Sequence, residues 1–233
     1  MPKYPPLEGI LFDFDGVLAY SAETHYVCWN NACLRLFSHP LSRETLEHHR
    51  GGASPMIAEA ICRSMQQPTL QAQALLQEKT NQLRNHISSI TTTTSMHTIL
   101  TFLSQGNIPW GVVSNAPEAI LREFFQFHKI TPQVLSGFDS VSAPKPSPKA
   151  YQESAIRLGV TPAHFSTIYV FEDSLPGITA AKKAGHTTVA VGDALHGSEG
   201  ELHTKDVVSF FMHYFNTLRT TPPFWPSNEK YKA

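Results

Sequence analysis

The chain has 233 residues, of which 41% are hydrophobic and 16% are charged, and its formal net charge is −1. These values indicate a folded protein of one large or two small domains rather than a disordered chain. The near-zero charge gives no general attraction to nucleic acid or to a membrane surface. No apolar stretch approaches the ~18 residues that span a bilayer, and the N-terminal residues do not form a signal peptide. We therefore expect a cytoplasmic protein that binds neither nucleic acid nor membranes.

The three cysteines are Cys28, Cys33 and Cys62. An odd number at these spacings predicts neither a disulfide framework nor a zinc site, and it fits a reducing compartment. The 12 histidines are scattered through the chain without a tract, so most of them should be surface residues or satisfied by neighbouring groups. The sequence leaves the oligomeric state open.

In chain order, the first predicted element is a buried strand at residues 9–12 (GILF), which ends in two carboxylates, Asp13 and Asp15. Burying two carboxylates this close together is costly unless a cation or a proton offsets their charge. Gly16 follows the pair and allows a sharp turn in which the backbone approaches a ligand. The alternative is an ordinary turn, since Asp-Gly is also a common turn signal.

Residues 20–90 contain helical patterns and no β-rich stretch. Apolar and aromatic residues recur at close to helical spacing between residues 21 and 37. Three more helix-like segments follow at residues 45–50, 55–65 and 71–90, with polar breaks between them. This part of the chain is therefore predicted to form a small all-helical domain.

From residue 91 onward, predicted strands alternate with predicted helices. The helices are expected at residues 96–105, 117–127, 148–158 and 175–184. The strands are expected at residues 108–114, 167–171 and 187–191, the last of these ending the sheet, with a short strand or loop at 133–141. Such alternation indicates parallel βαβ units. Residues 1–19 and 91–233 are thus predicted to form a doubly wound, Rossmann-like α/β core, whose tail has a helix near residues 207–218 and an irregular end at 220–233.

Three further polar clusters lie at the ends of predicted strands or just before a helix. Ser114 and Asn115 close one strand, Lys145 precedes a helix, and Glu172 and Asp173 close another strand. Each cluster has an ordinary alternative, because these side chains also cap helices and a lone lysine is usually solvated. In a doubly wound sheet, however, the carboxyl ends of the strands meet at one crevice. We therefore expect the three clusters to lie together with the first pair of aspartates.

The collected side chains suit phosphoryl transfer. Asp13, Asp15 and Asp173 supply hard oxygen ligands of the kind that Mg²⁺ prefers. The hydroxyl, amide and ammonium groups of the other clusters supply donors for phosphate oxygens. Phosphoryl chemistry needs this combination of a nucleophile, charge neutralisation and positioned donors.

Four segments resemble the motifs of the haloacid dehalogenase superfamily, in the same order and over nearly the whole chain. They are residues 13–18 (DFDGVL), 113–115 (VSN), 145–148 (KPSP) and 171–174 (FEDS). The resemblance implies that Asp13 is a nucleophile that forms an aspartyl-phosphate. It implies that Asp15 acts first as the general acid and then as the base. The dehalogenases that name the superfamily lack this second aspartate, so its presence favours phosphoryl transfer over carbon–halogen cleavage.

The same resemblance implies how the remaining groups act. Mg²⁺ would be held by Asp13, Asp173 and the backbone carbonyl of Asp15, with Glu172 nearby. The phosphoryl group would be bound by Ser114, Asn115 and Lys145, and Lys145 would also screen the repulsion among the carboxylates. The helical insertion resembles the family's cap, which closes over the site and selects the substrate.

Within this superfamily the chain resembles the β-phosphoglucomutase-like and phosphoglycolate phosphatase-like subfamily with a helical cap. Residues 21–26 and Trp29 are similar to the hinge region of its β-phosphoglucomutase-like members. His25 would there help to position Asp15 or the substrate; the alternative is a histidine on a helix surface. Lys79 resembles a cap lysine that contacts the substrate, and its alternative is a solvated helix lysine.

Residues 51–54 (GGAS) resemble a cap loop that leans into the site. The mutases carry an arginine in this loop for the distal phosphate of their substrate. Position 54 is serine here, so Arg50 is the nearest candidate for binding a substrate phosphate. This departure weakens the case for a mutase more than the case for a phosphatase.

The preferred hypothesis is a Mg²⁺-dependent phosphatase that hydrolyses a small phosphorylated metabolite, with a sugar phosphate as one candidate. The alternative is a phosphomutase, an isomerase that needs a second phosphate site in the cap. A third hypothesis is a binding protein that has lost catalysis, and the complete set of motif residues argues against it. The identity of the substrate is left open.

Overall fold

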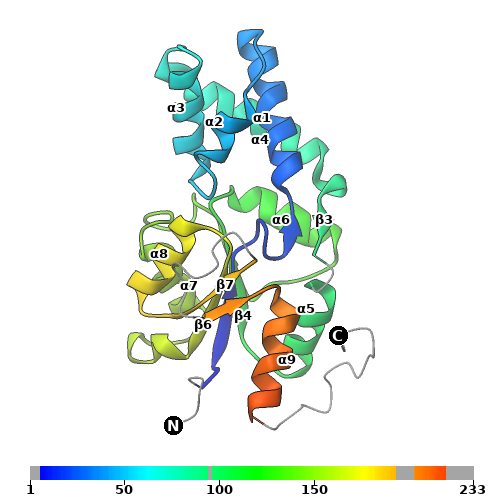
Figure 1. Ribbon diagram of the computed structural model, residues 1–233, viewed down its shortest axis with the longest axis vertical. Helices are drawn as coiled ribbons and strands as arrows, with labels where there is room; N and C mark the ends of the chain where they lie inside the picture. Colours follow the sequence, from blue (N-terminus) through cyan, green and yellow to red (C-terminus); the bar gives the residue numbers. More distant parts are fainter. Residues whose placement is uncertain (1–5, 94–95, 193–201, 219–233) are drawn as a thin grey trace.

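The computed structural model describes residues 6–93, 96–192 and 202–218. Within these residues, six parallel strands form one sheet in the order β5-β4-β1-β6-β7-β8 (Figure 1). The strands are β1 (Gly9–Phe12), β4 (Trp110–Val113), β5 (Val134–Ser136), β6 (Ile168–Glu172), β7 (Thr187–Val191) and β8 (Leu202–Thr204). The strand order runs outward from β1 in both directions, which confirms the predicted doubly wound α/β core. The end of β1 therefore lies at the switch point, where such sheets bind ligands.

Helices cover both faces of the sheet because each strand is apolar on both sides. Ile10 and Phe12 pack on one face, whereas Leu11 packs on the other. The first face is covered by α5 (Met96–Gln105), α6 (Glu118–Phe127) and α9 (Val207–Leu218). The second face is covered by α7 (Lys149–Arg157) and α8 (Leu175–Ala184).

Four helices inserted between β1 and β4 stand beyond the carboxyl ends of the strands (Figure 1). They are α1 (Ala22–Phe37), α2 (Arg43–Glu47), α3 (Ser54–Ser64) and α4 (Ala72–Asn85). Trp29, Cys33, Ile61 and Leu75 are buried among them and form a separate small core. We refer to these helices and their loops as the cap.

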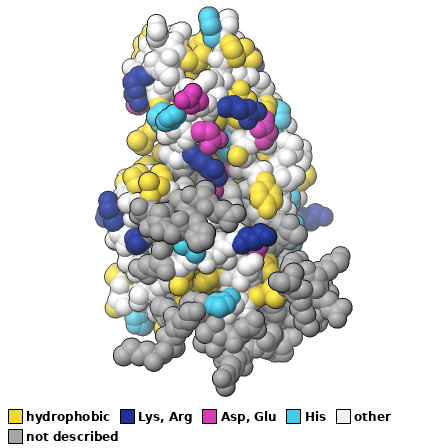
Figure 2. All heavy atoms as spheres, viewed as in Figure 1, with side chains coloured by type: hydrophobic (Ala, Val, Ile, Leu, Met, Phe, Trp, Pro, Cys, Tyr) yellow, Lys and Arg dark blue, Asp and Glu magenta, His cyan; other side chains and the backbone are white. Residues whose placement is uncertain are grey.

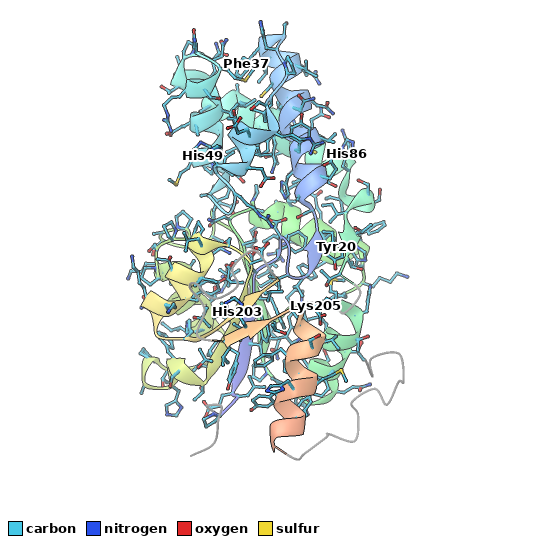
Figure 3. The ribbon with its side chains drawn as sticks, in the orientation of Figure 1. Tyr20, Phe37, His49, His86, His203 and Lys205 are labelled. Atoms are coloured by element: carbon cyan, nitrogen blue, oxygen red, sulfur yellow. The ribbon has the colours of Figure 1, made fainter. Side chains whose placement is uncertain are left out.

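The two crossings between the cap and the sheet are paired with each other. β2 (Ala19–Tyr20) and β3 (Thr91–Thr92) form a short antiparallel ladder, and Tyr20 marks this junction in Figure 3. The lower end of the cap reaches into the larger core, since Leu83 and Ile87 pack in the same cluster as α5 and α6. The division of the chain at residues 20 and 90 remains a prediction.

Most predicted elements are confirmed, and the bounds of α5, α8 and β7 agree with the prediction to the residue. The helix expected at residues 45–50 begins earlier, at Arg43, because the Ser42 hydroxyl accepts a hydrogen bond from the Thr45 N–H and caps it. The prediction that residues 187–191 form the last strand is wrong, since β8 pairs beside β7. A strand of three residues is too short to show a periodic pattern. The end expected to be irregular, residues 220–233, lies outside the described residues.

The surface shows no dominance of one charge on the face seen in Figure 2, where described basic and acidic side chains are interspersed. His49, His86 and His203 lie far from one another (Figure 3), in keeping with the scattered histidines of the sequence. None of the described helices is both long and apolar enough to cross a membrane.

Candidate active site

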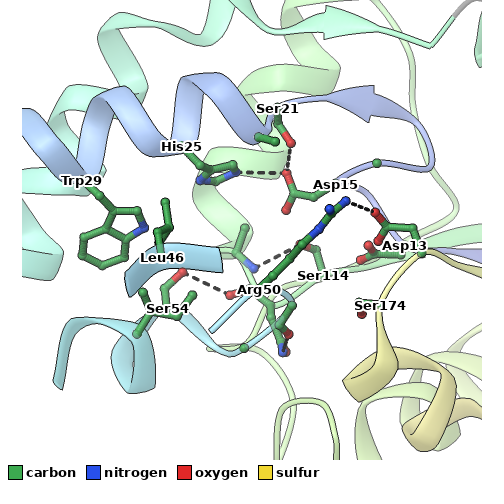
Figure 4. A pocket seen from close by; sticks show the side chains of 18 of the residues that line it. Asp13, Asp15, Ser21, His25, Trp29, Leu46, Arg50, Ser54, Ser114 and Ser174 are labelled. Atoms are coloured by element: carbon green, nitrogen blue, oxygen red, sulfur yellow. Dashed lines mark hydrogen bonds and ion pairs between the residues drawn. The ribbon is translucent and has the colours of Figure 1, made fainter. Parts of the chain in front are cut away.

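A cavity of about 440 Å³ lies between the carboxyl ends of the strands and the cap (Figure 4). All residues predicted for the site line it, with the exception of Glu172. The core contributes Asp13, Asp15, Ser114, Asn115, Lys145 and Asp173, and the cap contributes His25, Arg50 and Lys79. The topology thus brings together the polar clusters that follow separate strands of the sequence.

Lys145 is the buried cation of this site. Its ammonium group donates hydrogen bonds to Asp13 Oδ1 at 2.7 Å, to Glu172 Oε1 at 2.6 Å and to the Val113 carbonyl at 3.1 Å. Burial alone would lower the pKa of Lys145, but the charges of Asp13 and Glu172 raise it above its usual range. Lys145 therefore stays charged and neutralises part of the acidic cluster.

Glu172 lies behind the cavity, where its carboxylate is fully buried. Besides Lys145, it accepts hydrogen bonds from the Tyr151 hydroxyl at 2.6 Å and from the hydroxyl and N–H of Ser174 at 3.0 and 3.3 Å. Gly177 allows this approach, because a Cβ there would lie 1.9 Å from the Glu172 carboxyl carbon. Tyr151 was not predicted, since an aromatic residue on a buried helix face looks like ordinary core.

Three carboxylates gather at the place where a metal ion could bind. Oxygen atoms of Asp13, Glu172 and Asp173 all lie within 4.8 Å of one another. Burial and then the charge of Glu172 raise the pKa of Asp13 well above its usual range, although Lys145 opposes this. The same two causes raise the pKa of Asp173 to about 6, against the effect of Arg50. A hard divalent cation such as Mg²⁺ fits this set of oxygen ligands and would supply the missing positive charge.

Gly16 brings the first motif close to the metal-binding cluster. It has a φ of +83°, and a Cβ at this position would lie 2.0 Å from Asp173 Oδ2. Only glycine combines this backbone conformation with that approach. The turn predicted at Gly16 therefore serves to pack the segment around Asp15 against Asp173.

Asp15 is held by the start of α1. Its Oδ1 accepts hydrogen bonds from the Ser21 hydroxyl and from His25 Nε2, the latter at 3.0 Å (Figure 4). Burial alone would raise the pKa of Asp15, but the charge and hydrogen bond of His25, together with Ser21, lower it below its usual range. Ser21 was not among the predicted site residues, although it lies in the segment that resembled the hinge.

Asn115 joins the core to the cap loop, which we define as residues 50–54. Its Nδ2 donates to the Gly51 carbonyl at 2.8 Å and to the Lys145 carbonyl at 3.0 Å, and its Oδ1 accepts from the Lys145 N–H at 3.1 Å. Ser54 donates to the Asn115 carbonyl at 3.2 Å. Next to it, the buried Ser114 hydroxyl accepts from the Ala116 N–H at 3.1 Å. The side chain of Asn115 therefore contacts the backbone on both sides of the cavity.

The two predicted cap cations differ in their surroundings. Arg50 is half exposed, and its guanidinium donates to Asp173 Oδ2 at 2.8 Å. Lys79 is buried on α4, with its ammonium 5.3 Å from the centre of the Trp29 ring. Burial lowers the pKa of Lys79 to about 8, against the opposing charge of Asp15. Lys79 thus lines the cavity and is not the solvated helix lysine considered as its alternative.

A comparison with known protein families finds one family that matches the part of the chain containing all of these residues. The model of the haloacid dehalogenase-like hydrolases matches residues 10–191. The chain belongs to this hydrolase family. The resemblance found in its four motifs is therefore confirmed.

Several curated relatives are similar in sequence to most of this chain. A β-phosphoglucomutase of Bacillus subtilis is 28% identical over 198 residues, which cover 80% of this chain and 84% of the relative. A fructose-1-phosphate phosphatase of Escherichia coli is 28% identical over 191 residues, which cover 81% of this chain and 98% of the relative. A validoxylamine A 7'-phosphate phosphatase of Streptomyces hygroscopicus is 27% identical over 215 residues, 84% of this chain and 92% of the relative.

Solved structures share the fold of this hydrolase. A β-phosphoglucomutase of Clostridium difficile superposes with a TM-score of 0.77 over 91% of this chain and 97% of its own, at 20% identity. A predicted phosphoglycolate phosphatase of Haemophilus somnus gives a TM-score of 0.74 over 89% of this chain and 98% of its own, at 19% identity. At this identity the likeness shows the α/β core with a helical cap, and it shows no more than that.

Proposed function

We propose that this hydrolase is a Mg²⁺-dependent phosphatase of small phosphorylated metabolites, in particular of sugar phosphates. The observation that carries the proposal is the buried pair of Asp13 and Lys145, 2.7 Å apart, beside a second aspartate and under a cap. A buried carboxylate paired with an ammonium group can attack a phosphorus atom and has a cation beside the oxygens that gain charge. Two curated relatives are named phosphatases of a sugar phosphate and of validoxylamine A 7'-phosphate.

The reaction would take place in two steps on Asp13. Its carboxylate oxygen attacks the phosphorus atom of the substrate, the phosphorus–oxygen bond to the leaving group breaks, and Asp15 gives its proton to the leaving oxygen. Asp15 then takes a proton from water, which attacks the phosphorus atom and releases inorganic phosphate from Asp13. Ser114 would donate a hydrogen bond to the phosphoryl oxygens, and Lys145 would place its positive charge beside them through its pair with Asp13.

The protonation of Asp15 would change during this cycle. Ser21 and His25 lower its pKa and keep it ionised, which suits its role as the base. A phosphoester dianion bound beside Asp13 raises the pKa of a neighbouring carboxyl group, as the role of acid requires. His25 is therefore proposed to position Asp15 and to adjust its proton affinity.

A bound Mg²⁺ would neutralise the negative charge that gathers on the phosphoryl group and on the carboxylates. Asp13 and Asp173 would hold it through their side chains, and Asp15 through its backbone carbonyl. The raised pKa values of Asp13 and Asp173 support this proposal, because burial and the charge of Glu172 outweigh the pairing of these carboxylates with Lys145 and Arg50, and a bound cation would offset the remaining cost of their charge.

We also propose that residues 20–90 act as the domain that selects the substrate, while residues 1–19 and 91–233 carry out the reaction. A small-molecule phosphoester fits the volume of the cavity. All three cysteines are free and buried, which supports a reducing compartment such as the cytoplasm.

A phosphomutase is the alternative, and the β-phosphoglucomutase relative supports it. That activity needs a cation in the cap for a second phosphate. Among the described residues that line the cavity from the cap, the lysine and arginine side chains are Arg50, paired with Asp173, and Lys79, buried near Asp15. Each of them therefore already faces a carboxylate of the site, and for this reason the phosphatase is preferred.

The two activities are distinguished by their products. The protein is incubated with Mg²⁺ and a panel of phosphoesters that includes hexose 1-phosphates, and inorganic phosphate and hexose 6-phosphate are measured separately. Release of phosphate in proportion to substrate consumed supports the phosphatase. Formation of hexose 6-phosphate without release of phosphate would overturn it in favour of the mutase.

Substitution of the two aspartates tests the mechanism under either activity. Asp13→Asn should abolish turnover, because an amide oxygen does not form the acyl-phosphate. Asp15→Asn should slow turnover by about 10²–10⁴-fold and leave a trapped phosphoenzyme, since proton transfer is lost. Intact-protein mass spectrometry detects the added phosphoryl group. An Asp13→Asn variant as active as the wild type would contradict the proposal.

A further inference from the structure

Tyr151 brings a hydroxyl group into an apolar layer. It lies on α7 with a fully buried side chain, in the cluster that packs α7 and α8 against the sheet. A hydroxyl in such a layer is costly unless it has a hydrogen-bond partner. Its partner is Glu172 Oε1, at 2.6 Å. Phenylalanine would fill the same space without a polar group, so the hydroxyl needs an explanation of its own.

Glu172 is held on both carboxylate oxygens. Oε1 accepts from Lys145 and Tyr151, and Oε2 accepts from the N–H and the hydroxyl of Ser174. An ionised carboxylate has about four acceptor sites, and the protein fills all four. Glu172 therefore has no free site for a metal ion, although its oxygens lie near Asp13 and Asp173.

Lys145 in turn is fixed by three acceptors. Its ammonium group has three N–H donors, and they point to Asp13, Glu172 and the Val113 carbonyl. Two of these acceptors carry negative charge and pull the ammonium group in different directions. The distance from Lys145 to Asp13 therefore depends on how strongly Glu172 attracts the ammonium group.

We propose that Tyr151 is a positioning residue for the phosphoryl transfer on Asp13, and this inference rests on the function proposed above. Its hydroxyl shares Glu172 Oε1 with Lys145 and so limits the pull of Glu172 on the ammonium group. Glu172 accordingly acts as a fixed anchor for Lys145 and is not a direct metal ligand. Burial and the nearby charge of Glu172 raise the pKa of Tyr151 well above its usual range, so the hydroxyl stays a donor.

Loss of the Tyr151 hydroxyl should shift Lys145. Oε1 of Glu172 would then have one donor left, and its charge would draw the ammonium group away from Asp13. Ground-state binding of a phosphoester depends on several groups, whereas charge screening at Asp13 matters most as the new bond forms. The change should therefore appear in kcat more than in KM.

Tyr151→Phe tests this inference, with Ser154→Ala as the matched control. Ser154 is a fully buried hydroxyl on the same helix, and it bonds to Ser136 at 2.8 Å instead of to Glu172. Tyr151→Phe should lower kcat about tenfold or more and change KM less than twofold, as expected for one lost hydrogen bond to a charged group. Ser154→Ala should leave both constants within twofold of the wild type.

A second readout does not depend on turnover. The buried Lys145 ammonium group should give its own slowly exchanging signal in a ¹H–¹⁵N NMR spectrum of the lysine side chains, assigned with Lys145→Arg. Tyr151→Phe should shift this signal, and Ser154→Ala should not. If the wild type shows no turnover and Tyr151→Phe still shifts the Lys145 signal, the proposed function is overturned, whereas the positioning of Lys145 by Tyr151 stands.

The role of Tyr151 is overturned if the folded Tyr151→Phe protein keeps the wild-type kcat and the wild-type Lys145 signal. Ser174→Gly provides an independent variant, because it removes another donor to Glu172 and glycine is still an acceptable helix cap. It should change the same two readouts in the same direction. If Tyr151→Phe does not fold, wild-type values of both readouts in Ser174→Gly overturn the inference.

Discussion

At the scale of single residues, the site holds more negative charge than its side chains neutralise. Asp13, Glu172 and Asp173 lie together, and Lys145 and Arg50 are the cations in contact with them. The two cations do not neutralise this charge equally well. Lys145 is buried together with its partners, whereas the pair of Arg50 and Asp173 is partly open to solvent and is therefore weaker. A resident divalent cation would complete the balance.

The raised pKa of Asp173, about 6, makes the stability of the metal-free protein depend on pH. An unfolded aspartate loses its proton near pH 4, so between about pH 4 and 6 the native state binds more protons than the unfolded state. The free energy of unfolding therefore falls as the pH rises through this window and stays lower above it. Below the window this residue costs no stability.

Asp173→Asn should remove that dependence. In metal-free buffer its Tm should match the wild type near pH 4 and exceed it by several degrees at pH 7.5, because one pKa unit corresponds to about 1.4 kcal/mol and each kcal/mol to about 2–4 °C. Differential scanning calorimetry over this range measures the difference. Glu47→Gln, at an exposed acid on the cavity rim, is the control. A Tm difference that does not grow with pH would contradict the assignment of the charge to Asp173.

At the scale of elements, α8 depends on glycine at its first turn. The Ser174 hydroxyl accepts from the Gly177 N–H at 3.2 Å and caps the helix. A Cβ at position 177 would lie 1.9 Å from Oε1 of Glu172, which is too close for any contact. The start of this helix is therefore shaped around the Glu172 carboxylate.

Gly177→Ala should destabilise the protein by about 1–3 kcal/mol, as other overpacked buried sites do. This is the opposite of the usual effect, since alanine in a helix interior is more favourable than glycine by about 1 kcal/mol. Urea unfolding measures the change. Thr179→Ala, in the same helix, should have little effect. A Gly177→Ala protein more stable than the wild type would show that Glu172 moves aside at little cost.

The sequence predicts those elements and site residues that depend on local pattern. The bounds of α8 follow from the helix-forming segment between Ser174 and Gly185, and Gly185 indeed has a φ of +86° at the end of the helix. The meeting of the strand-end clusters at one crevice was predicted because the topology of a doubly wound sheet brings them together. β8 and the β2–β3 ladder were not predicted, since strands of two or three residues show no periodic pattern and their partners lie far along the chain.

The site residues that the sequence did not predict share one property. Tyr151 and Ser21 act through a hydroxyl whose partner comes from another element, Glu172 and Asp15 respectively. A hydroxyl carries no pattern that names its partner, so each looked like an ordinary helix or hinge residue. Asn115 was predicted as a ligand of substrate, and the structure adds its contact with Gly51 in the cap loop.

At the scale of the whole molecule, the cap loop closes the cavity through contacts to two strand ends. Gly51 and Ser54 contact Asn115 after β4, and Arg50 contacts Asp173 after β6. The Arg50 contact uses an oxygen of a proposed metal ligand. Closure of the cap and occupation of the metal site are therefore expected to influence each other.

Arg50→Gln should free Asp173 and loosen the closed arrangement. Mg²⁺ should bind several-fold more tightly, because no guanidinium group competes for the carboxylate, and the metal-free protein should have a larger radius of gyration. Isothermal titration calorimetry and small-angle X-ray scattering measure the two effects. Arg43→Gln is the matched control, since Arg43 pairs with Glu23 within the cap. Equal Mg²⁺ affinity in Arg50→Gln and the wild type would contradict competition at Asp173.

The β2–β3 ladder has a consequence for how such enzymes diversify. The inserted segment leaves and rejoins the core at two adjacent strands, Ala19–Tyr20 and Thr91–Thr92, which are tied to each other. A different helical segment that ends in the same pair of strands could be grafted at this point without changing a residue that follows β1, β4 or β6. Exchange of the inserted segment could in this way change the part that is proposed to select the substrate and leave the proposed catalytic residues unchanged.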